Sequence, residues 1–220
     1  MQYIGPMINL LWRGWPRMAG LAGALVGAAF LAQASTAADG PNFDPDEGHI
    51  RVQNPADLTP AEAEKLYQRL LDPMVQGYLK SGLYDINYRD WHRFNSQPYL
   101  SDQHGARLVN VYANDAGREM LDASTANPMP VGAKIAKDSV SVVKSGGTAR
   151  GPLFLMEKMS PGFAPEFGNW RYTMVMPNGK IFGATRGAGS SVVKFCAECH
   201  ALAADNDYLF PLPQDALISQ

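Results

Sequence analysis

The sequence predicts an α+β fold, in which helices flank an antiparallel sheet of about five strands and a further helix lies near the C-terminus. Three observations support this. A helical pattern with a start signal precedes residue 88, strand-like segments follow between residues 106 and 183, and a helical segment begins near residue 189. Because short turns join the strand-like segments, neighbouring strands are expected to pair in antiparallel order.

The first helix is predicted from the segment "LTPAEAEKL". Thr59 can cap the helix, Pro60 suits the first helical position, and Glu62 completes a capping box. Apolar residues at helical spacing follow, and Pro73 is expected to kink or end the helix. The segment "DINYRDWHRFN", residues 85–95, shows a second short helical pattern.

The sheet is predicted from strand-like stretches with turn signals between them. These stretches are "ARLVNVYAN", "GAKIAKDSVSVV", "GPLFLMEKM", "WRYTMVM" and "KIFG". The Pro-Asn-Gly sequence at residues 177–179 is a strong hairpin signal between the last two. The closing helix is predicted over "GSSVVKFCAECHALAAD", with Ser190 or Ser191 as its cap and Val192, Val193 and Phe195 facing inward.

The N-terminus has the layout of a secretory signal peptide. Arg13 and Arg17 precede an apolar run over residues 18–32, and the small residues Ser35 and Ala37 mark a cleavage site. The alternative is an uncleaved membrane anchor, but the run is shorter than the ~20 residues that span a bilayer comfortably. We therefore expect export to a bacterial periplasm, by cleavage after residue 37.

The charge of the chain argues against nucleic acid as a partner. The formal net charge is −2, and the leader holds two arginines and no acid, so the exported chain is more acidic still. A nucleic-acid-binding domain would carry a basic surface instead.

The motif "CAECH" carries the chemistry of the chain. Cys196 and Cys199 are the only cysteines, and His200 follows directly. A structural zinc site needs four ligands, and the other histidines are scattered. A thioredoxin-like dithiol needs a strand before the motif and a parallel sheet around it. Both alternatives stay open, but the spacing favours one covalent haem c per chain. On a helix, residues i and i+3 share a face and can reach two vinyl groups, and His200 can then ligate the iron.

Several segments resemble the cytochrome P-460 family, which includes the sheet-built beta-type cytochromes c-prime. They are "WHRFNSQPYLSDQHGARLVNVYANDAG", "MPVGAKIAKDSV", "GPLFLMEKM", "NWRYTMVMPNG" and "FCAECH", and together they cover about residues 88–213. The resemblance implies a haem stacked on a five-stranded antiparallel sheet, with an open distal pocket. Members oxidise hydroxylamine or bind nitric oxide, and in the enzymes a lysine is bonded to the porphyrin edge.

The chain then divides into four parts. They are a signal peptide (1–37), a linker or N-terminal arm (38–56), an N-terminal helical segment (57–87) and a cytochrome P-460-like haem domain (88–220). Only 20 residues follow His200, and they contain neither Met nor His. A sixth iron ligand would therefore come from before the motif, and we expect the distal position to be open.

Three further residues are candidates for the site. Strand alternation places Lys137 on the face of Ile135, where it can approach the haem; the alternative is a solvated lysine paired with Asp138. Glu157 and Glu166 are candidate catalytic residues that could accept a proton from hydroxylamine, and the alternative is that each forms a surface ion pair.

Other residues near the predicted site have a default role in the core. The methionines are core fillers unless one ligates the iron, and His104 is expected to make a local hydrogen bond. Aromatic residues could wall the distal face. These candidates are Met156, Met159, Met174, Met176, Phe154, Phe163 and Trp170.

The sequence thus predicts a periplasmic mono-haem c-type cytochrome with an open distal site, which binds or oxidises small nitrogen compounds such as hydroxylamine or nitric oxide. The alternative is a non-enzymatic electron-transfer or gas-binding cytochrome. The expected partners are a small-molecule ligand or substrate and a periplasmic electron carrier, with a homodimer as one oligomeric state. Whether the protein is an enzyme, as a hydroxylamine-type oxidoreductase, is left open by the sequence.

Overall fold

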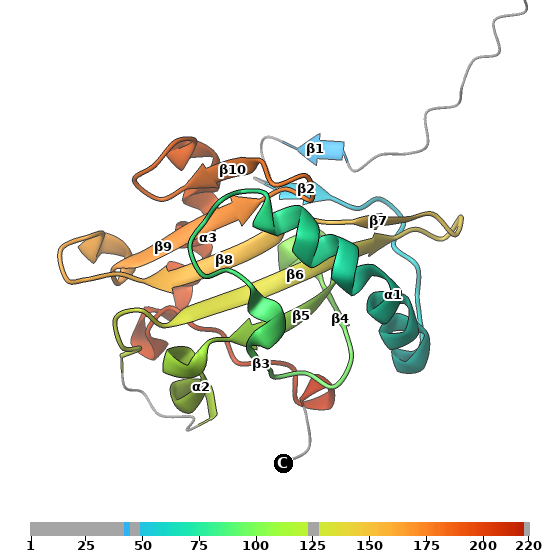
Figure 1. Ribbon diagram of the computed structural model, residues 1–220, viewed down its shortest axis with the longest axis horizontal. Coiled ribbons are helices and arrows are strands. Elements are labelled where there is room, and N and C mark those ends of the chain that lie inside the picture. Colours follow the sequence, from blue (N-terminus) through green and yellow to red (C-terminus); the bar gives the residue numbers. More distant parts are fainter. Residues whose placement is uncertain (1–41, 45–48, 123–127, 218–220) are drawn as a thin grey trace, which may run out of the picture. The chain divides into compact units, whose positions relative to one another are not determined.

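An antiparallel sheet organises the computed structural model, which describes residues 42–44, 49–122 and 128–217 (Figure 1). The strand order is β10-β9-β8-β6-β5-β3, with β4 also paired to β5 and β7 to β6. The bounds are β3 His92–Arg93, β4 Tyr99–Ser101, β5 Arg107–Ala113, β6 Lys134–Val142, β7 Thr148–Arg150, β8 Leu153–Lys158, β9 Trp170–Val175 and β10 Ile181–Ala184. The predicted α+β class is confirmed, and the five predicted strands are β5, β6, β8, β9 and β10. The short strands β3, β4 and β7 were not predicted.

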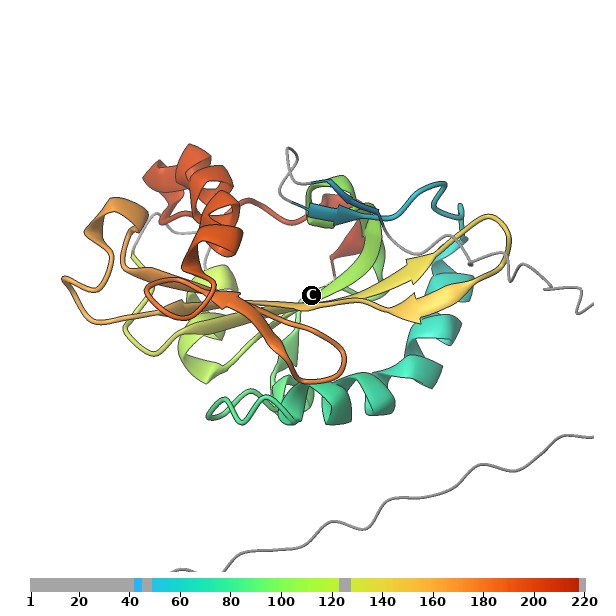
Figure 2. The same cartoon turned by 90° about the horizontal axis from the view of Figure 1, so that it is seen from above.

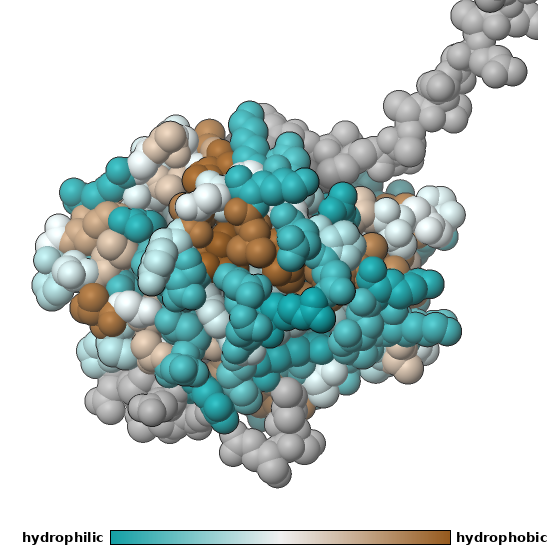
Figure 3. Space-filling view, in the orientation of Figure 1, coloured by the Kyte–Doolittle hydropathy of each residue, from teal (hydrophilic) through white to brown (hydrophobic). Residues whose placement is uncertain are grey.

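Helices lie on both faces of the sheet. Figure 2 shows α1 (Pro60–Leu79) below the sheet and α3 (Lys194–His200), with the C-terminal segment, above it. Because side chains alternate along a strand, each face has its own core. On the α1 face, Tyr67, Tyr78 and Tyr112 belong to one buried cluster, while on the α3 face Trp170 and Ala197 belong to another. In Figure 3 the α1 face is mostly hydrophilic, with an apolar area near the C-terminal end of α1.

Helix α1 begins as its sequence predicts and continues further than expected. The Thr59–Glu62 capping box is present, with Pro60 at the helix start. Pro73 lies inside the helix and does not end it. The buried residues Met74 and Tyr78 follow it, and their burial against the sheet offsets the roughly 3 kcal/mol that an internal proline costs.

The segment expected to form a second helix contains no α-helix. It contains one 3-10 turn, η1 (Tyr88–Asp90), followed by β3. Pairing with β5 decides this conformation, because His92 lies opposite Ala113 and the Phe94 amide donates to the Val111 carbonyl at 2.9 Å. Helix α2 (Asp115–Asp122), where the sequence signals only a strand end, was also not predicted.

The end of the expected N-terminal arm is tied to the sheet. Strand β1 (Asn42–Asp44) pairs with β2 (His49–Arg51). The Val52 amide then donates to the Gly105 carbonyl at 2.9 Å, and the Ala56 amide to the Val142 carbonyl at 2.8 Å. The expected signal peptide, residues 1–37, lies outside the described residues. Within the described part of the chain, no helix has both the length and the apolar content of a membrane span.

The closing helical segment is divided into short helices. They are η4 (Ser190–Val193), α3 and η5 (Ala201–Asn206), and a further 3-10 turn, η6 (Gln214–Ala216), lies beyond the predicted helix. Neither Ser190 nor Ser191 caps a helix, because η4 starts after Gly189, which has a left-handed conformation. Val193 is buried as predicted, but the inward prediction for Val192 is wrong, since it is 40% exposed.

Candidate functional site

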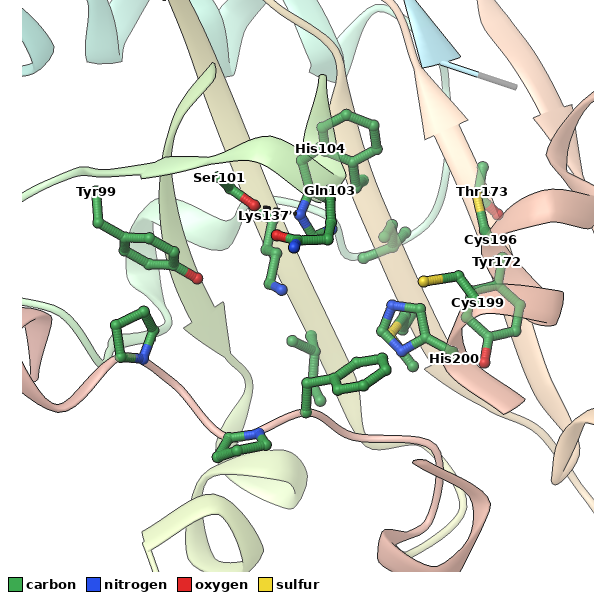
Figure 4. Close-up of a pocket in the computed structure, with 17 residues that line it drawn as sticks. Tyr99, Ser101, Gln103, His104, Lys137, Tyr172, Thr173, Cys196, Cys199 and His200 are labelled. Carbon is green, nitrogen blue, oxygen red and sulfur yellow. Dashed lines mark hydrogen bonds between the residues drawn. The ribbon is translucent and has the colours of Figure 1, made fainter. Parts of the chain in front are cut away.

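A pocket of about 320 Å³ lies on the α3 face of the sheet. Its walls come from the β4–η2 region (η2, Asp102–His104), from β6, β8 and β9, from α3, and from the segment 210–213. Figure 4 shows the cysteines and His200 of α3 on one side, with Lys137 and the η2 residues across from them. Sequence positions more than 90 residues apart therefore meet at one site.

Both cysteines of the motif line this pocket, and both are free thiols. Burial raises the pKa of Cys196 to about 12, so the thiol is the stable form at neutral pH. Zinc ligation and disulfide exchange both use the thiolate. Among the described residues, no group of three or more His, Cys, Asp or Glu side chains is placed to share a metal ion. Neither observation supports a zinc site or an exchanging disulfide, and the spacing of the motif favours covalent haem c.

His200 has one ring nitrogen committed to the protein. Its Nδ1 lies 2.6 Å from the Tyr208 carbonyl oxygen, which can only accept, so Nδ1 carries the proton and donates. Burial lowers the pKa of His200 to about 4, with the Tyr208 carbonyl opposing and Lys137 adding to this effect. The imidazole is therefore neutral at pH 7, and its Nε2 lone pair is the one suited to iron.

The residues present fit a haem c. The thiols and the imidazole stand on one wall, and the sheet supplies apolar side chains such as Ile135, Phe154 and Met156. Tyr172 also lines the pocket, and its buried hydroxyl has no hydrogen-bond partner within the described structure. A ligand in the pocket could supply that partner, as buried polar groups generally require.

Lys137 points into the pocket, as Figure 4 shows. It lies opposite Phe154 in the β6–β8 pairing, so both side chains are on the α3 face. Burial lowers the pKa of Lys137 to about 8, opposed by the nearby Cys199. The alternative pairing with Asp138 is not formed: Asp138 is on the α1 face, where it accepts from Tyr67 at 2.6 Å and Asn110 at 3.2 Å.

The two candidate carboxylates are not among the residues that line the pocket. Glu157 lies opposite Lys134 in the sheet, on the α1 face, and accepts from Arg171 at 3.1 Å. Glu166 is in η3 (Pro165–Phe167), half-exposed, with Arg186 at 3.5 Å. Both placements match the ion-pair alternative, and they supply no observation in favour of catalysis.

The remaining candidates divide between pocket and core. Phe154, Met156 and His104 line the pocket, whereas Trp170 is fully buried in the core. Met159, Met174, Met176 and Phe163 are not among the lining residues. His104 makes the expected local hydrogen bond, with Nδ1 2.8 Å from the Ser101 hydroxyl, and its ring packs edge-on against Phe154.

Polar residues on the wall that faces α3 were not predicted from the sequence, and neither were Tyr172 and Thr173 of β9. Tyr99, Ser101 and Gln103 come from β4 and η2 and line the wall that faces α3. The available signal was the polar stretch "YLSDQHG", where a glycine with positive φ ends a short turn just before a buried strand. Loops at strand ends often carry functional residues.

The sheet, the pocket and the Cys-Cys-His arrangement together define a cytochrome of the haem c class. The family model described as Cytochrome P460 matches residues 86–211. The chain therefore belongs to the cytochrome P460 family, which binds haem c, and the match agrees closely with the resemblance over residues 88–213. Comparison with curated proteins gives no match.

Proposed function

We propose that the protein binds small nitrogen compounds, such as nitric oxide or hydroxylamine, at an open distal position of its haem, and that hydroxylamine is oxidised there. One observation carries this proposal. The wall across the pocket from His200 presents Lys137, Ser101 and Gln103, which can hydrogen-bond a small polar ligand. Haem c, when bound, supplies an iron that coordinates such a ligand and exchanges electrons.

The pocket residues that could act as a sixth ligand are few. Among the described lining residues, Met156 and His104 carry the thioether and the imidazole that serve as the sixth ligand in electron-transfer cytochromes. Met156 is 8% exposed and lies between Ile135 and Tyr172 in the sheet register, so packing fixes its position. The His104 ring is held by Ser101 and Phe154. We therefore propose that neither ligates the iron.

Oxidation of hydroxylamine releases protons together with electrons, so an enzyme needs a proton acceptor near the iron. None of the described lining residues is a carboxylate. Lys137, whose lowered pKa of about 8 leaves part of its amine neutral in mildly alkaline solution, is the better-placed acceptor. The electrons would leave to a periplasmic carrier.

The absence of a lining carboxylate also favours a second candidate, a gas-binding cytochrome without turnover. A covalent bond between Lys137 and the porphyrin edge would favour the enzyme instead, by the resemblance to the oxidising members of the family, and the bonded nitrogen would then not be the proton acceptor. Formation of this bond replaces one amine N–H and one porphyrin C–H by a C–N bond, and a peroxide oxidant would take up both electrons and both protons as water. A protease digest in which the Lys137 peptide travels with the haem peptide would show that bond.

Ligand binding by the purified holoprotein tests the proposal. The ferrous protein should be high-spin and should bind carbon monoxide and nitric oxide, and hydroxylamine should reduce an added acceptor. Lys137→Met should lower turnover by about 10²-fold or more, which is the lower end of what the loss of a positioned proton acceptor costs. The control is Lys134→Met, because Lys134 is also a buried lysine but lies on the α1 face, and this variant should retain activity. A low-spin ferrous spectrum that carbon monoxide leaves unchanged would refute the open site.

We further propose that the chain is exported to the periplasm and that its mature form begins near Ala38. The support is the leader pattern of Arg13, Arg17 and the apolar run. N-terminal sequencing of the periplasmic fraction should start close to Ala38, whereas an intact Met1 in the membrane fraction would favour the anchor. Sedimentation of the same material would decide between a monomer and the proposed homodimer.

A further inference from the structure

The segment that follows α3 holds the carbonyl that hydrogen-bonds to His200 in an unfavourable conformation. Asp207 and Tyr208 both have positive φ values, 47° and 68°. For residues other than glycine, each such conformation costs about 1–3 kcal/mol and persists only when neighbouring contacts impose it. Those two residues nevertheless turn the Tyr208 carbonyl toward the ring of His200, 2.6 Å from Nδ1.

Asp207 is held in place by three separate elements. Its carboxylate forms an ion pair with Lys158 of β8, at 2.5 Å, and accepts from the Met129 amide at 2.7 Å. Its carbonyl accepts from the Trp170 indole of β9 at 2.9 Å. These three contacts of Asp207, like that of Tyr208 to His200, are made to groups on the α3 face of the domain.

The ion pair is nearly buried and well supported. The side chains of Lys158 and Asp207 are 9% and 13% exposed. The Lys158 amine also lies 5.0 Å from the centre of the Trp170 ring, and Lys158 and Trp170 are opposite each other in the β8–β9 pairing. A buried pair of this kind is sensitive to the loss of one partner, because the other charge is then left without compensation.

We propose that Lys158 and Asp207 are positioning residues, which set the hydrogen bond between Tyr208 and His200 and through it the properties of the haem iron. This rests on the proposed role of His200 as iron ligand. When a histidine binds a metal through one ring nitrogen, a hydrogen bond from the other ring nitrogen fixes the orientation of the ring and makes the imidazole a more basic ligand. A histidine that donates more electron density to the iron stabilises the ferric form. The intact ion pair is therefore expected to lower the reduction potential of the haem.

The proposal predicts a common effect for variants that loosen the turn in different ways. Lys158→Met removes the cation, Asp207→Asn removes the anion, and Trp170→Phe removes one hydrogen-bond donor without any change of charge. Each should weaken the iron–histidine bond and favour ferrous iron, by on the order of tenfold in the ferrous-to-ferric ratio at fixed potential, or about 59 mV. Lys158→Arg keeps the positive charge, so it should largely retain the wild-type reduction potential and iron–histidine band.

Lys134→Met is the matched control. Lys134 also has a side chain only 8% exposed, in an ion pair with Asp85 at 3.3 Å, but it is on the α1 face. Lys134→Met also removes one buried cation, although its partner Asp85 is 53% exposed, and it leaves the contacts of Asp207 unchanged. Both the potential and the iron–histidine band should therefore stay at their wild-type values.

Redox titration and resonance Raman spectra of the ferrous holoproteins provide the test. The expected result is a downward shift of the iron–histidine stretching band and a raised potential in the three variants, with neither change in the control or in Lys158→Arg. Wild-type values in all three variants, or an equal shift in Lys134→Met, would overturn the positioning role alone. A wild-type protein without an iron–histidine band would instead refute the assignment of His200, and the positioning role with it. If Asp207→Asn does not fold, Trp170→Phe gives the decisive comparison.

Discussion

Asp138 offers a stringent test of the packing on the α1 face. Its carboxylate is fully buried and accepts from Tyr67 and Asn110, and Tyr112 in turn hydrogen-bonds to Tyr67. Burial raises the pKa of Asp138 from 3.8 to about 6, and the hydrogen bonds from Tyr67 and Asn110 offset only part of that rise. Folding therefore disfavours the ionised form of Asp138 relative to the protonated form.

The sign of the pH effect follows from the raised pKa. The folded state binds this proton more tightly than the unfolded state, so the contribution of Asp138 to stability is complete below pH 3.8 and is lost as the pH rises through 6. A shift of this size corresponds to about 3 kcal/mol in full, and to about 2 kcal/mol between pH 7 and pH 4.5.

Asp138→Asn removes the titration while keeping the shape of the side chain. The difference in unfolding free energy between wild type and variant should move by about 2 kcal/mol in favour of wild type between pH 7 and pH 4.5. Urea unfolding at each pH measures it, and other carboxylates cancel in the difference. Asp57→Asn, at an exposed position, should show no such trend. A pH-independent difference for Asp138→Asn would refute the reasoning.

Two further substitutions test how the fold positions the site. Thr59→Ala should lower stability by about 1 kcal/mol in urea unfolding, because it removes the capping box of α1, and an unchanged midpoint would contradict that role. Gly183→Ala places a Cβ 2.3 Å from the Gly189 carbonyl, just before the helices that carry the motif, and should reduce the yield of haem-loaded protein. Gly187→Ala, where the nearest atom is 3.4 Å away, should keep that yield, and equal losses in both variants would argue against a specific clash.

The elements with strong local signals were predictable. The capping box at Thr59, the hairpin at Pro177 and the alternation in β6 fixed the class and the main strands, and the spacing of the Cys motif fixed the cofactor. What failed depended on distant partners. Residues 92–93 form a strand because β5 has a free edge there, and α1 passes Pro73 because its far end is buried.

The site was predictable only in part, for the same reason. The alternation of β6 placed Lys137 on the face of Ile135, but only the sheet register shows that Glu157 is on the opposite face. Nothing local in "AADNDYLF" marks Asp207 as the partner of Lys158, which lies 49 residues earlier. Long-range ion pairs and left-handed turns leave little trace in composition or period.

The intact mass of the denatured, purified protein tests the central claim most directly. The claim is that Cys196 and Cys199 carry one haem in covalent linkage, on the α3 wall of the pocket. The polypeptide should stay coloured after denaturation, with the mass of one haem added, and the chain should be uncoloured when both cysteines are replaced by alanine. Colour that passes completely into acidified acetone, leaving the mass of the bare chain, would contradict it.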